Sequence, residues 1–400
     1  MGLNATMGRA IGAQGIGAVF TALVSFALLV YLGRVLGTET FGHYVAILNT
    51  ALLGLILIEG GWPTLVYRET AGRDVAAGHG HRLAGRAVAH MLVAAGLLVM
   101  LTLGLHALGM ASLALPAALL CMLAVALMNL VSARLRGAGR FGHEALWQGS
   151  GRVASALLIV ACVLWFSVRL PWLFIAWTAG LCLVLWFGGR RWLALPRYPG
   201  ACYRLVLPFL VLEGLIVFLI KGDMALLGAL KPGPEQLSYY AACSRLTEAA
   251  VLLFSPVSNV LLRSFRQIES STHFMALVRR MLALAWVAGM MAVLLSMVYG
   301  RQLMPMLFGP DFRAAGALLP WLAAVLPVAL SNLVLIQALI AQGRERVLAL
   351  GLLVGALCLC VALASGLHLA GTRGAALGLV GTQALLFVIL LRMVSEKRSL

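Results

Sequence analysis

The stretch GTETFGHYVA, residues 37–46, is a polar interruption between two long apolar runs. A related stretch, GPEQLSYYAA, occupies residues 233–242. Aligned at a shift of 196 residues, the two share a glycine, a glutamate, a tyrosine and an alanine: Gly37 with Gly233, Glu39 with Glu235, Tyr44 with Tyr240 and Ala46 with Ala242. A repeat of about half the chain length predicts that the two halves share one architecture.

The composition is typical of a protein that crosses a membrane many times. Of the 400 residues, 62% are hydrophobic and 11% are charged, and the mean hydropathy is +1.00. A soluble globular domain has about a quarter of its residues charged, so this chain lacks the charge to cover a surface exposed to water. The net charge of +17 comes from basic residues clustered between apolar runs, which orients helices in a membrane. It does not predict a nucleic-acid partner.

The apolar runs predict an all-α polytopic membrane protein with about twelve transmembrane helices. A bilayer core of about 30 Å needs roughly 20 apolar residues per helix. The runs that meet this length are 13–33, 42–62, 87–106, 112–133, 145–167, 170–189, 205–229, 238–262, 281–299, 315–339, 347–368 and 373–391. The seven cysteines form no CxxC pair and lie mostly within these runs, so we expect neither a disulfide framework nor a metal site.

The basic residues between the runs support this layout. If the runs cross the membrane in turn, 21 Lys and Arg residues fall on one side and six fall on the other. The six are Arg34, Arg169, Lys231, Arg301, Arg313 and Arg373. Lys and Arg concentrate on the cytoplasmic side of membrane proteins, so both termini are predicted to be cytoplasmic.

On this layout the two repeated stretches occupy equivalent connections, one between spans 1 and 2 and one between spans 7 and 8. Six spans separate them, so the halves are predicted to be parallel repeats related by an axis along the membrane normal. We therefore expect two six-helix lobes, residues 1–200 and 201–400, around a central cavity. Such lobes are typical of carriers that work by alternating access. A duplication without a transport pathway is the alternative.

Six charged side chains fall inside the predicted spans: Arg152, Glu213, Lys221, Asp223, Arg245 and Glu248. An ionisable group in hydrocarbon costs at least about 2.5 to 3.5 kcal/mol on insertion scales, so we expect these groups to face the bundle interior or water. At about 1.5 Å per residue, Lys221 and Arg245 are predicted to lie at nearly the same depth below the outer surface.

Two interpretations of these charges stay open. They line the pathway of a substrate or coupling ion, or they pair with one another and hold helices together. Arg245 and Glu248 are three residues apart on one helical face and can neutralise each other, and a bridge from Asp223 to Arg245 would join spans 7 and 8. Glu59 and His90, near the inner ends of spans 2 and 3, are weaker candidates for the same pathway.

The chain lacks residues that several classes of enzyme need for their chemistry. The chain has three aspartates, Asp74, Asp223 and Asp311, which are far apart in sequence, so the paired carboxylates that hold a metal and a diphosphate are missing. The sequence contains no P-loop for ATP and no nucleophile elbow. We therefore expect a protein that is not an enzyme and that uses no cofactor.

Three segments together resemble a known family. GRVLGTETFGHYVAILNTALLGLILIEGGWPTLVYRETA (33–71), GPEQLSYYAACSRLTE (233–248) and MLFGPDFRAAGALLP (306–320) are similar to segments of the polysaccharide transporters. These form the O-antigen-flippase-like branch of the multidrug/oligosaccharidyl-lipid/polysaccharide exporter superfamily. Its members carry an LG, acidic, FG, Tyr pattern between spans 1 and 2 and an Arg-Glu pair just inside span 2, here Arg68 and Glu69.

The resemblance implies a flippase that moves a polyprenyl-diphosphate-linked oligosaccharide from the inner to the outer leaflet of a bacterial cytoplasmic membrane. It implies that the cations Arg152, Lys221 and Arg245 receive the diphosphate. Glu213, Asp223 and Glu248 would then compete for those cations or carry protons. The implied partners are the lipid-linked oligosaccharide, membrane lipid, protons or sodium ions, and the polymerase and glycosyltransferases of polysaccharide synthesis. The proximity of Lys221 and Asp223 matches no pattern of the family.

Two other functions stay open from the sequence. One is an ion-coupled exporter of drugs or metabolites from the same superfamily, which would share the fold and differ in the chemistry of its cavity. The cations and the few aromatic residues of spans 7 and 8 argue against a lipophilic cation as substrate. The other is a membrane-embedded polysaccharide synthase or ligase, which the missing carboxylate pairs and the short connections disfavour.

Overall fold

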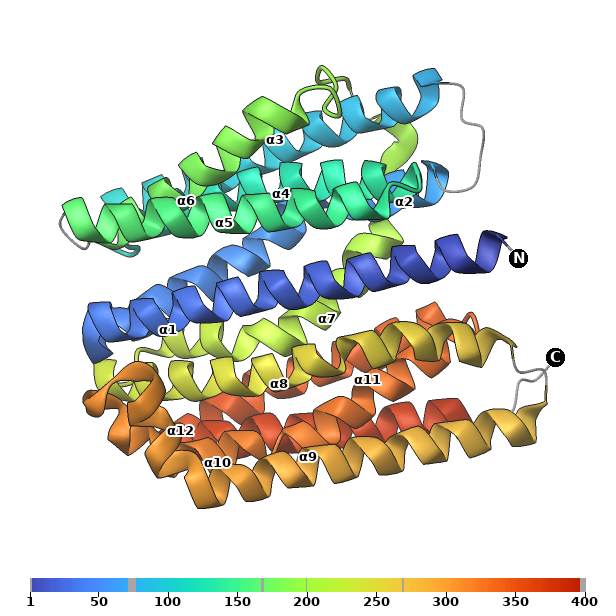
Figure 1. Cartoon of the computed structure of the whole chain (residues 1–400). Coiled ribbons are helices and arrows are strands. Elements are labelled where there is room, and N and C mark those ends of the chain that lie inside the picture. Colours follow the sequence, from blue (N-terminus) through green and yellow to red (C-terminus); the bar gives the residue numbers. More distant parts are fainter. Residues whose placement is uncertain (1, 71–76, 167–168, 199, 268–269, 396–400) are drawn as a thin grey trace. The chain divides into compact units, whose positions relative to one another are not determined.

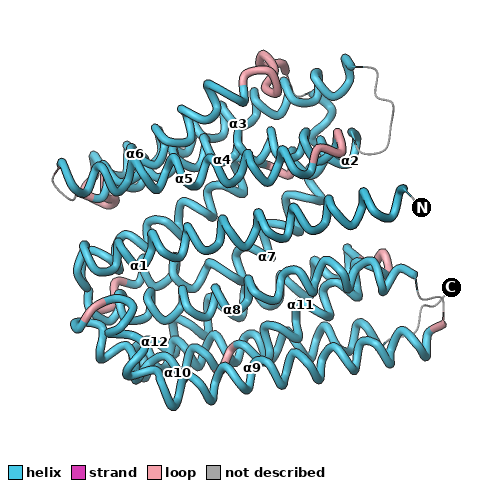
Figure 2. Tube along the Cα trace, in the orientation of Figure 1, coloured by secondary structure: helices cyan, strands magenta, loops and turns pink. Residues whose placement is uncertain are grey.

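The computed structural model of the protein describes residues 2–70, 77–166, 169–198, 200–267 and 270–395. Within these ranges the regular elements are all helices, as Figure 1 and Figure 2 show. The predicted all-α fold class is therefore confirmed. Long apolar helices with short connections are expected in a membrane, because a helix satisfies its backbone hydrogen bonds within one segment.

Most helices follow the predicted spans closely. Spans 3 to 6 correspond to α3 (Ala77–Ala107), α4 (Ala114–Gly137), α5 (Phe141–Trp165) and α6 (Leu170–Val184), which continues into the π-helical turn η1 (Leu185–Gly189). A short turn, η2 (Gly200–Cys202), leads into the helices of spans 7 to 9: α7 (Tyr203–Leu230), α8 (Pro234–Gln267) and α9 (Ser271–Phe308).

Two very long helices each contain two predicted spans. The first, α1 (Gly2–Glu59), is broken at Gly37, where φ is 71°. The last, α12 (Glu345–Ser395), is broken at Ala370 and Gly371, and the φ of Gly371 is 61°. Glycine adopts positive φ at little cost, so a glycine at each break lets the chain turn between the two segments.

The structure departs from the predicted runs in two regions, after span 2 and within span 10. The chain turns at Gly60 and Gly61 and continues as the separate helix α2 (Trp62–Thr70). Span 10 is divided into α10 (Ala315–Ala323) and α11 (Leu326–Ala341), which are bent by 43° and follow the turn η3 (Pro310–Ala314). Apolar periodicity reports which residues are buried but not where a helix bends, so the sequence did not predict these breaks.

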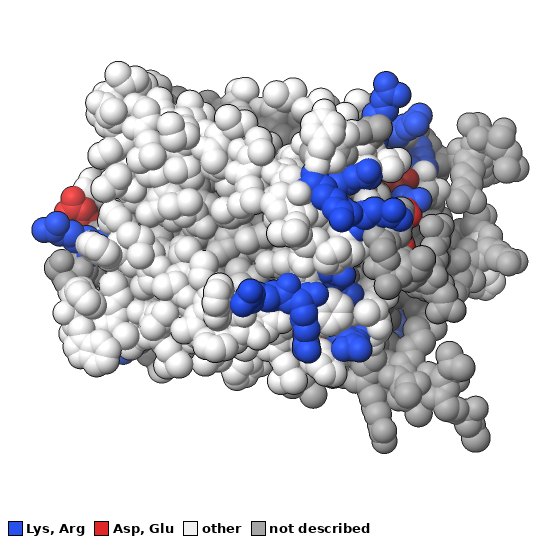
Figure 3. All heavy atoms as spheres, turned by 90° about the horizontal axis from the view of Figure 1, so that it is seen from above, with Lys and Arg blue, Asp and Glu red and all other residues white. Residues whose placement is uncertain are grey.

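The helices are long and apolar enough for a multi-pass membrane protein. By length and composition, eight helices in the described part of the chain qualify as membrane spans, or nine if α10 and α11 form one span. Because α1 and α12 each hold two segments and α8 is long but more polar, this number agrees with about twelve crossings. Figure 3 shows charged side chains at the left end of the visible face and in its right half. A broad band without charged side chains lies between them.

The chain forms two compact units. Unit 1 contains Met1–Leu29 and Ile47–Val217, and unit 2 contains Val30–Ala46 and Phe218–Leu400. The middle of α1, around Gly37, is therefore part of unit 2, whereas the start of α7 is part of unit 1. The division into repeats at residue 200 concerns the duplication of the sequence and stays a prediction.

Unit 1 is built around α4. This helix packs against α2, α3, α5 and α6, and α5 lies along α6 (Figure 1). At the contact between α5 and α6, a Cβ atom on Gly180 would lie 2.6 Å from the Cα atom of Ser155, so only glycine permits this approach. Small residues at such contacts are typical of membrane helices, which associate by close packing.

Unit 2 is built around α11. This helix packs against α8, α9 and α12, and α10 packs against α8 and α9. The segment Val30–Ala46 packs onto the same unit. The ring of Phe41 lies 5.7 Å from that of Phe308 and 5.7 Å from that of Phe312, and Arg34 donates through Nε to the carbonyl oxygen of Leu307 at 2.7 Å.

Candidate functional site

Unit 2 holds a compact group of charges between α7 and α8. The Nζ atom of Lys221, on α7, binds Oε2 of Glu248, on α8. The same oxygen accepts a hydrogen bond from Nη1 of Arg245 at 2.7 Å. The side chains are largely withdrawn from the surface, with exposures of 21% for Lys221, 9% for Arg245 and 13% for Glu248. One carboxylate therefore holds two cations together.

Asp223 lies beside this group and has a different partner. Its Oδ2 atom accepts a hydrogen bond from the hydroxyl group of Tyr240 at 3.1 Å. Asp223 is 3% exposed and Tyr240 is fully buried. Lys221 and Asp223 are two residues apart and so point in different directions from α7. Each of them meets a different residue of α8.

The ion pair between α7 and α8 therefore differs from the one considered from the sequence. It joins Lys221 to Glu248 rather than Asp223 to Arg245. Lys221 and Arg245 reach the same carboxylate oxygen, and their equal depth below the outer surface stays a prediction.

The charges of this group balance, since Lys221 and Arg245 offset Asp223 and Glu248. Its hydrogen bonds are not all satisfied. The second oxygen of Glu248, Oε1, is buried and accepts no hydrogen bond from the part of the chain that the structure describes. An unsatisfied buried acceptor costs about 1 to 3 kcal/mol. The site therefore has a position where a donor group would be stabilised.

Unit 1 holds a chain of polar side chains that begins at Glu59. Asn129 Nδ2 donates to Glu59 Oε1 at 2.7 Å, and Gln148 Nε2 donates to Asn129 Oδ1 at 3.4 Å and to the Ser132 hydroxyl at 2.7 Å. Ser132 in turn donates to Glu144 Oε1 at 3.1 Å. These residues come from α1, α4 and α5, so one polar chain links three helices.

Glu213 and His90 also lie in unit 1. The Thr64 hydroxyl, on α2, donates to Glu213 Oε1 at 2.6 Å. The ring of His90 contacts the hydroxyl of Tyr203 through Nδ1 at 3.1 Å and the carbonyl oxygen of Leu57 through Nε2 at 3.0 Å. Neither Glu59 nor Glu213 takes part in an ion pair within the described ranges, and each accepts from a neutral donor.

Arg152 completes the predicted set. It projects from α5, and its guanidinium group lies 5.8 Å from the centre of the Trp177 ring on α6. This cation–π contact belongs to unit 1. Of the six candidate charges, the structure thus brings four together in unit 2 and leaves Arg152 and Glu213 in unit 1 with the weaker candidates Glu59 and His90.

The partners of these charges were missed from the sequence. Asn129 and Gln148 are single amides inside apolar runs, which is a weak signal, and Thr64 lies at a break that was not predicted. Tyr240 was recognised only as a residue that the two repeated stretches share. No group of three or more His, Cys, Asp or Glu residues that could hold a metal ion occurs in the described ranges.

Comparison with known proteins identifies the family. A family model described as polysaccharide biosynthesis protein matches residues 8–269, which is more than half of the chain. The chain belongs to this family. A comparison with proteins of curated function gives no match.

Solved structures show that this member of the polysaccharide biosynthesis protein family has the fold of known transporters. Lipid II flippase MurJ, in an inward closed conformation, matches with a TM-score of 0.78 at 13% identity, over 96% of this chain and 87% of MurJ. An inward-facing multidrug resistance MATE family transporter of the MOP superfamily matches with a TM-score of 0.73 at 14% identity, over 93% and 94% of the two chains. A MOP superfamily transporter from Pyrococcus furiosus gives a TM-score of 0.64 at 15% identity, over 97% of each chain.

Proposed function

We propose that the protein is a flippase that moves a polyprenyl-diphosphate-linked oligosaccharide from the inner to the outer leaflet of a bacterial cytoplasmic membrane. Membership of the polysaccharide biosynthesis protein family supports the link to surface sugars. The fold shared with a lipid II flippase supports the movement of a lipid-linked substrate. Neither requires an enzyme or a cofactor.

The observation that carries the proposal is the pair of cations that share the carboxylate of Glu248. Lys221 of α7 and Arg245 of α8 bind the same carboxylate oxygen within unit 2. A diphosphate presents several oxygens that carry negative charge, and charge-assisted hydrogen bonds to such oxygens are strong in a low dielectric. We assign the diphosphate to this pair of cations, and Arg152, which lies in unit 1, stays a separate candidate for a contact with the substrate.

Glu248 stabilises the two cations when no substrate is bound. Two unpaired cations in a membrane would be costly. While the site is empty, Glu248 pairs with both cations and Asp223 supplies the second negative charge. The diphosphate would replace Glu248 as the partner of Lys221 and Arg245. The carboxylate and the substrate thus compete for the same cations, which keeps binding weak enough for release.

Coupling to an ion gradient is assigned to unit 1. Glu59 and Glu213 accept hydrogen bonds from Asn129 and Thr64, which are neutral. A carboxyl group held by a neutral donor gains or loses a proton without breaking an ion pair. We therefore propose that these two groups carry coupling protons, with sodium ions as the competing possibility.

Reconstitution of the purified protein in liposomes tests this function. The liposomes would contain a polyprenyl-diphosphate oligosaccharide, and a membrane-impermeant lectin would report sugar that reaches the outer surface. The Lys221→Ala, Arg245→Ala double variant should lose transport. The matched control is Arg279→Ala, Arg280→Ala, which removes two exposed charges from α9 of the same unit.

Two results would overturn the proposal. Wild-type protein that is correctly inserted but moves no lipid-linked sugar would exclude the flippase. In cells, deletion of the gene with unchanged surface polysaccharide and no accumulation of lipid-linked intermediate would do the same. If the double variant folds and transports at the full rate, the cations belong to helix pairing and not to the substrate.

An exporter of drugs or metabolites is the second candidate. The fold is also shared with MATE family transporters, and the carboxylates of Asp223, which is buried, and Glu248, which is 13% exposed, would suit a cationic substrate. The liposome assay separates the two, because an exporter would move a soluble dye and leave the lipid-linked sugar in place.

The proposed location is the inner membrane with both termini in the cytoplasm. Reporter fusions at each terminus test this orientation, because a fluorescent protein folds in the cytoplasm and alkaline phosphatase is active outside it. Partners among glycosyltransferases and a polysaccharide polymerase follow from the proposed substrate and can be tested by cross-linking in cells.

A further inference from the structure

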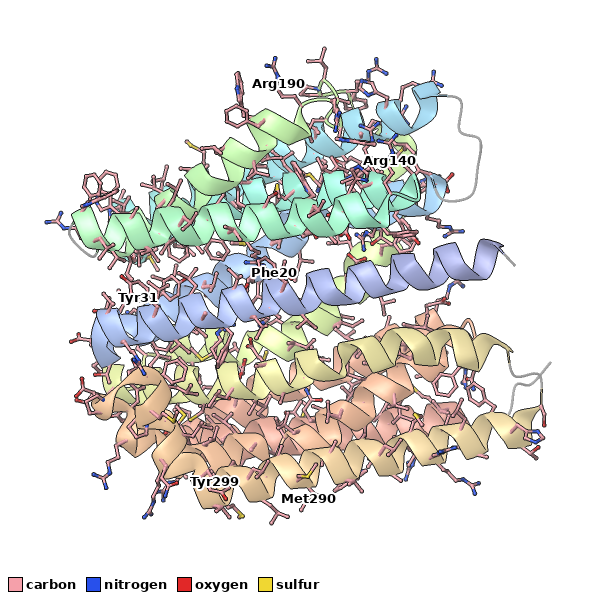
Figure 4. The ribbon with its side chains drawn as sticks, in the orientation of Figure 1. Phe20, Tyr31, Arg140, Arg190, Met290 and Tyr299 are labelled. Carbon is pink, nitrogen blue, oxygen red and sulfur yellow. The ribbon has the colours of Figure 1, made fainter. Side chains whose placement is uncertain are left out.

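One end of unit 1 carries arginines that lie against tryptophan rings. We call the group formed by Arg134, Arg140, Arg190, Arg191, Trp186 and Trp192 the arginine–tryptophan cluster. Arg134 is in the last turn of α4, Arg140 precedes α5, Trp186 is in η1 and the remaining residues follow η1. Figure 4 labels Arg140 beside the turn from α4 to α5 and Arg190 at the end of η1. The cluster plays no part in the proposed substrate site.

The cluster has a defined geometry. The guanidinium groups of Arg134 and Arg140 lie 5.7 and 5.6 Å from the centre of the Trp192 ring. Arg134 also donates through Nη1 to the carbonyl oxygen of Trp192. Arg190 lies 4.6 Å from the centre of the Trp186 ring. These contacts already restrict the arginine side chains. They therefore lose less conformational entropy on binding a ligand than isolated surface arginines do.

The positive charges of the cluster meet no carboxylate partner in the part of the chain that the structure describes. None of its four arginines takes part in an ion pair within the described residues, although two of them contact the same indole ring. Like charges held close together repel one another, and an anion between them would relieve that repulsion. A guanidinium group that stacks on a ring through its face keeps N–H groups at its edge, which suit the oxygens of a phosphate.

The surroundings of the cluster match the surface of a bilayer. Trp186 is 63% exposed and its neighbour Phe187 is 81% exposed. Arg140, Arg190 and Arg191 are exposed at the same end of the unit, and Figure 3 shows basic side chains gathered in the right half of the visible face. Exposed aromatic residues next to basic ones are typical of the level of the lipid headgroups.

We propose that the arginine–tryptophan cluster binds the phosphate headgroup of an anionic phospholipid. The aromatic rings lie among the upper acyl chains and headgroups, and the edges of the guanidinium groups bind the phosphate. The need for basic residues on the cytoplasmic side explains the presence of charge here, but lysines would meet it equally well. Three arginines held against two rings present pairs of N–H groups that match two oxygens of a phosphate, which the single ammonium group of a lysine does not.

The test is retention of lipid by the full-length protein. Purified protein would be exchanged into nanodiscs containing equal amounts of phosphatidylglycerol and phosphatidylcholine, and native mass spectrometry would count the lipids that remain bound. We expect wild type to prefer phosphatidylglycerol. Because each basic residue near an anionic surface contributes roughly fivefold to binding, Arg140→Ala, Arg190→Ala, Arg191→Ala should lose this preference.

Two variants distinguish a specific lipid site from the general attraction of basic residues to anionic lipid. Arg279→Ala, Arg280→Ala, Arg346→Ala removes three exposed arginines from unit 2 and should leave the preference unchanged. Trp192→Leu keeps every charge and should still weaken retention several-fold, because Arg134 and Arg140 lose their shared ring. Equal loss in the unit 2 variant, an unchanged preference in Trp192→Leu, or binding of soluble phosphate without preference for phosphatidylglycerol would overturn the proposal.

Discussion

The backbone amide of Gly42 donates a hydrogen bond to the hydroxyl oxygen of Ser238 at 2.9 Å. These two residues are 196 positions apart, which is the shift that aligns the repeated stretches of the sequence. Equivalent positions of the two repeats therefore meet within unit 2. Such a meeting is expected where a symmetry axis passes between two copies of one element, because only there do equivalent residues come into contact.

The contact leaves no room for a side chain on Gly42. A Cβ atom there would clash with the Ser238 hydroxyl and would lie 2.8 Å from its backbone nitrogen. We expect Gly42→Ala to destabilise the protein by about 1 to 3 kcal/mol, as overpacking does in other proteins. Thermal unfolding in detergent would measure the effect.

The control for this substitution is Gly96→Ala in α3. A Cβ atom on Gly96 meets no atom within 4 Å, so alanine there should be neutral or stabilise by up to about 1 kcal/mol through its helix propensity. Equal unfolding temperatures for the two variants would contradict the close approach of the repeats.

Removal of the carboxylate charge at Glu248 should be strongly destabilising. Glu248→Gln removes the carboxylate that both Lys221 and Arg245 bind, and breaking a buried ion pair costs about 3 to 5 kcal/mol. The matched control is Glu235→Gln, an exposed position on the same helix. If both variants unfold at the wild-type temperature, Glu248 does not hold the two cations.

Tyr240→Phe should lower the stability of the protein, because it removes the hydrogen bond to Asp223. The variant removes the only hydrogen atom that Tyr240 donates to the buried carboxylate, at an expected cost of about 1 to 3 kcal/mol. A double-mutant cycle with Asp223→Asn should give a coupling energy of about 0.5 to 3 kcal/mol. Tyr239→Phe, one position earlier on α8, keeps its ring contact with Phe312 and should show no coupling.

Glu59→Gln should uncouple transport from a proton gradient. The amide still fills the position next to Asn129 but no longer exchanges a proton at neutral pH. In liposomes, acceleration of lipid movement by a pH gradient should disappear, while movement without a gradient persists. Glu39→Gln, at an exposed position of α1, serves as the control and should respond to the gradient as wild type does. A full response in Glu59→Gln would exclude this group as the proton carrier.

The course of the helices was predictable from the sequence because hydrocarbon imposes a simple rule. Each crossing needs an apolar run of fixed length, and the twelve runs recur in the structure with few changes. The break at Gly37 lies within the polar stretch GTETFGHYVA, which separates the first two apolar runs. By contrast, the bend between α10 and α11 lies inside one apolar run, where packing and not composition decides the path.

The candidate site was predictable in its members but not in its pairing. A charge inside an apolar span stands out in the sequence, so Lys221, Arg245 and Glu248 were predictable as members of the site. Which of the acidic groups holds the cations depends on the rotation of α7 against α8, and no pattern within one helix reports that angle. The neutral partners, such as Asn129 and Tyr240, carry no charge and therefore gave no signal.

The exchange of segments between the units affects the order in which the protein is completed during synthesis. Val30–Ala46 leaves the ribosome early, yet it packs against α8 and α9 of unit 2, which are made much later. Unit 1 in turn lacks its last segment until Val217 has emerged. Two fragments cut near residue 200 would each lack a piece that the other contains, so they should insert stably only when both are produced in the same cell.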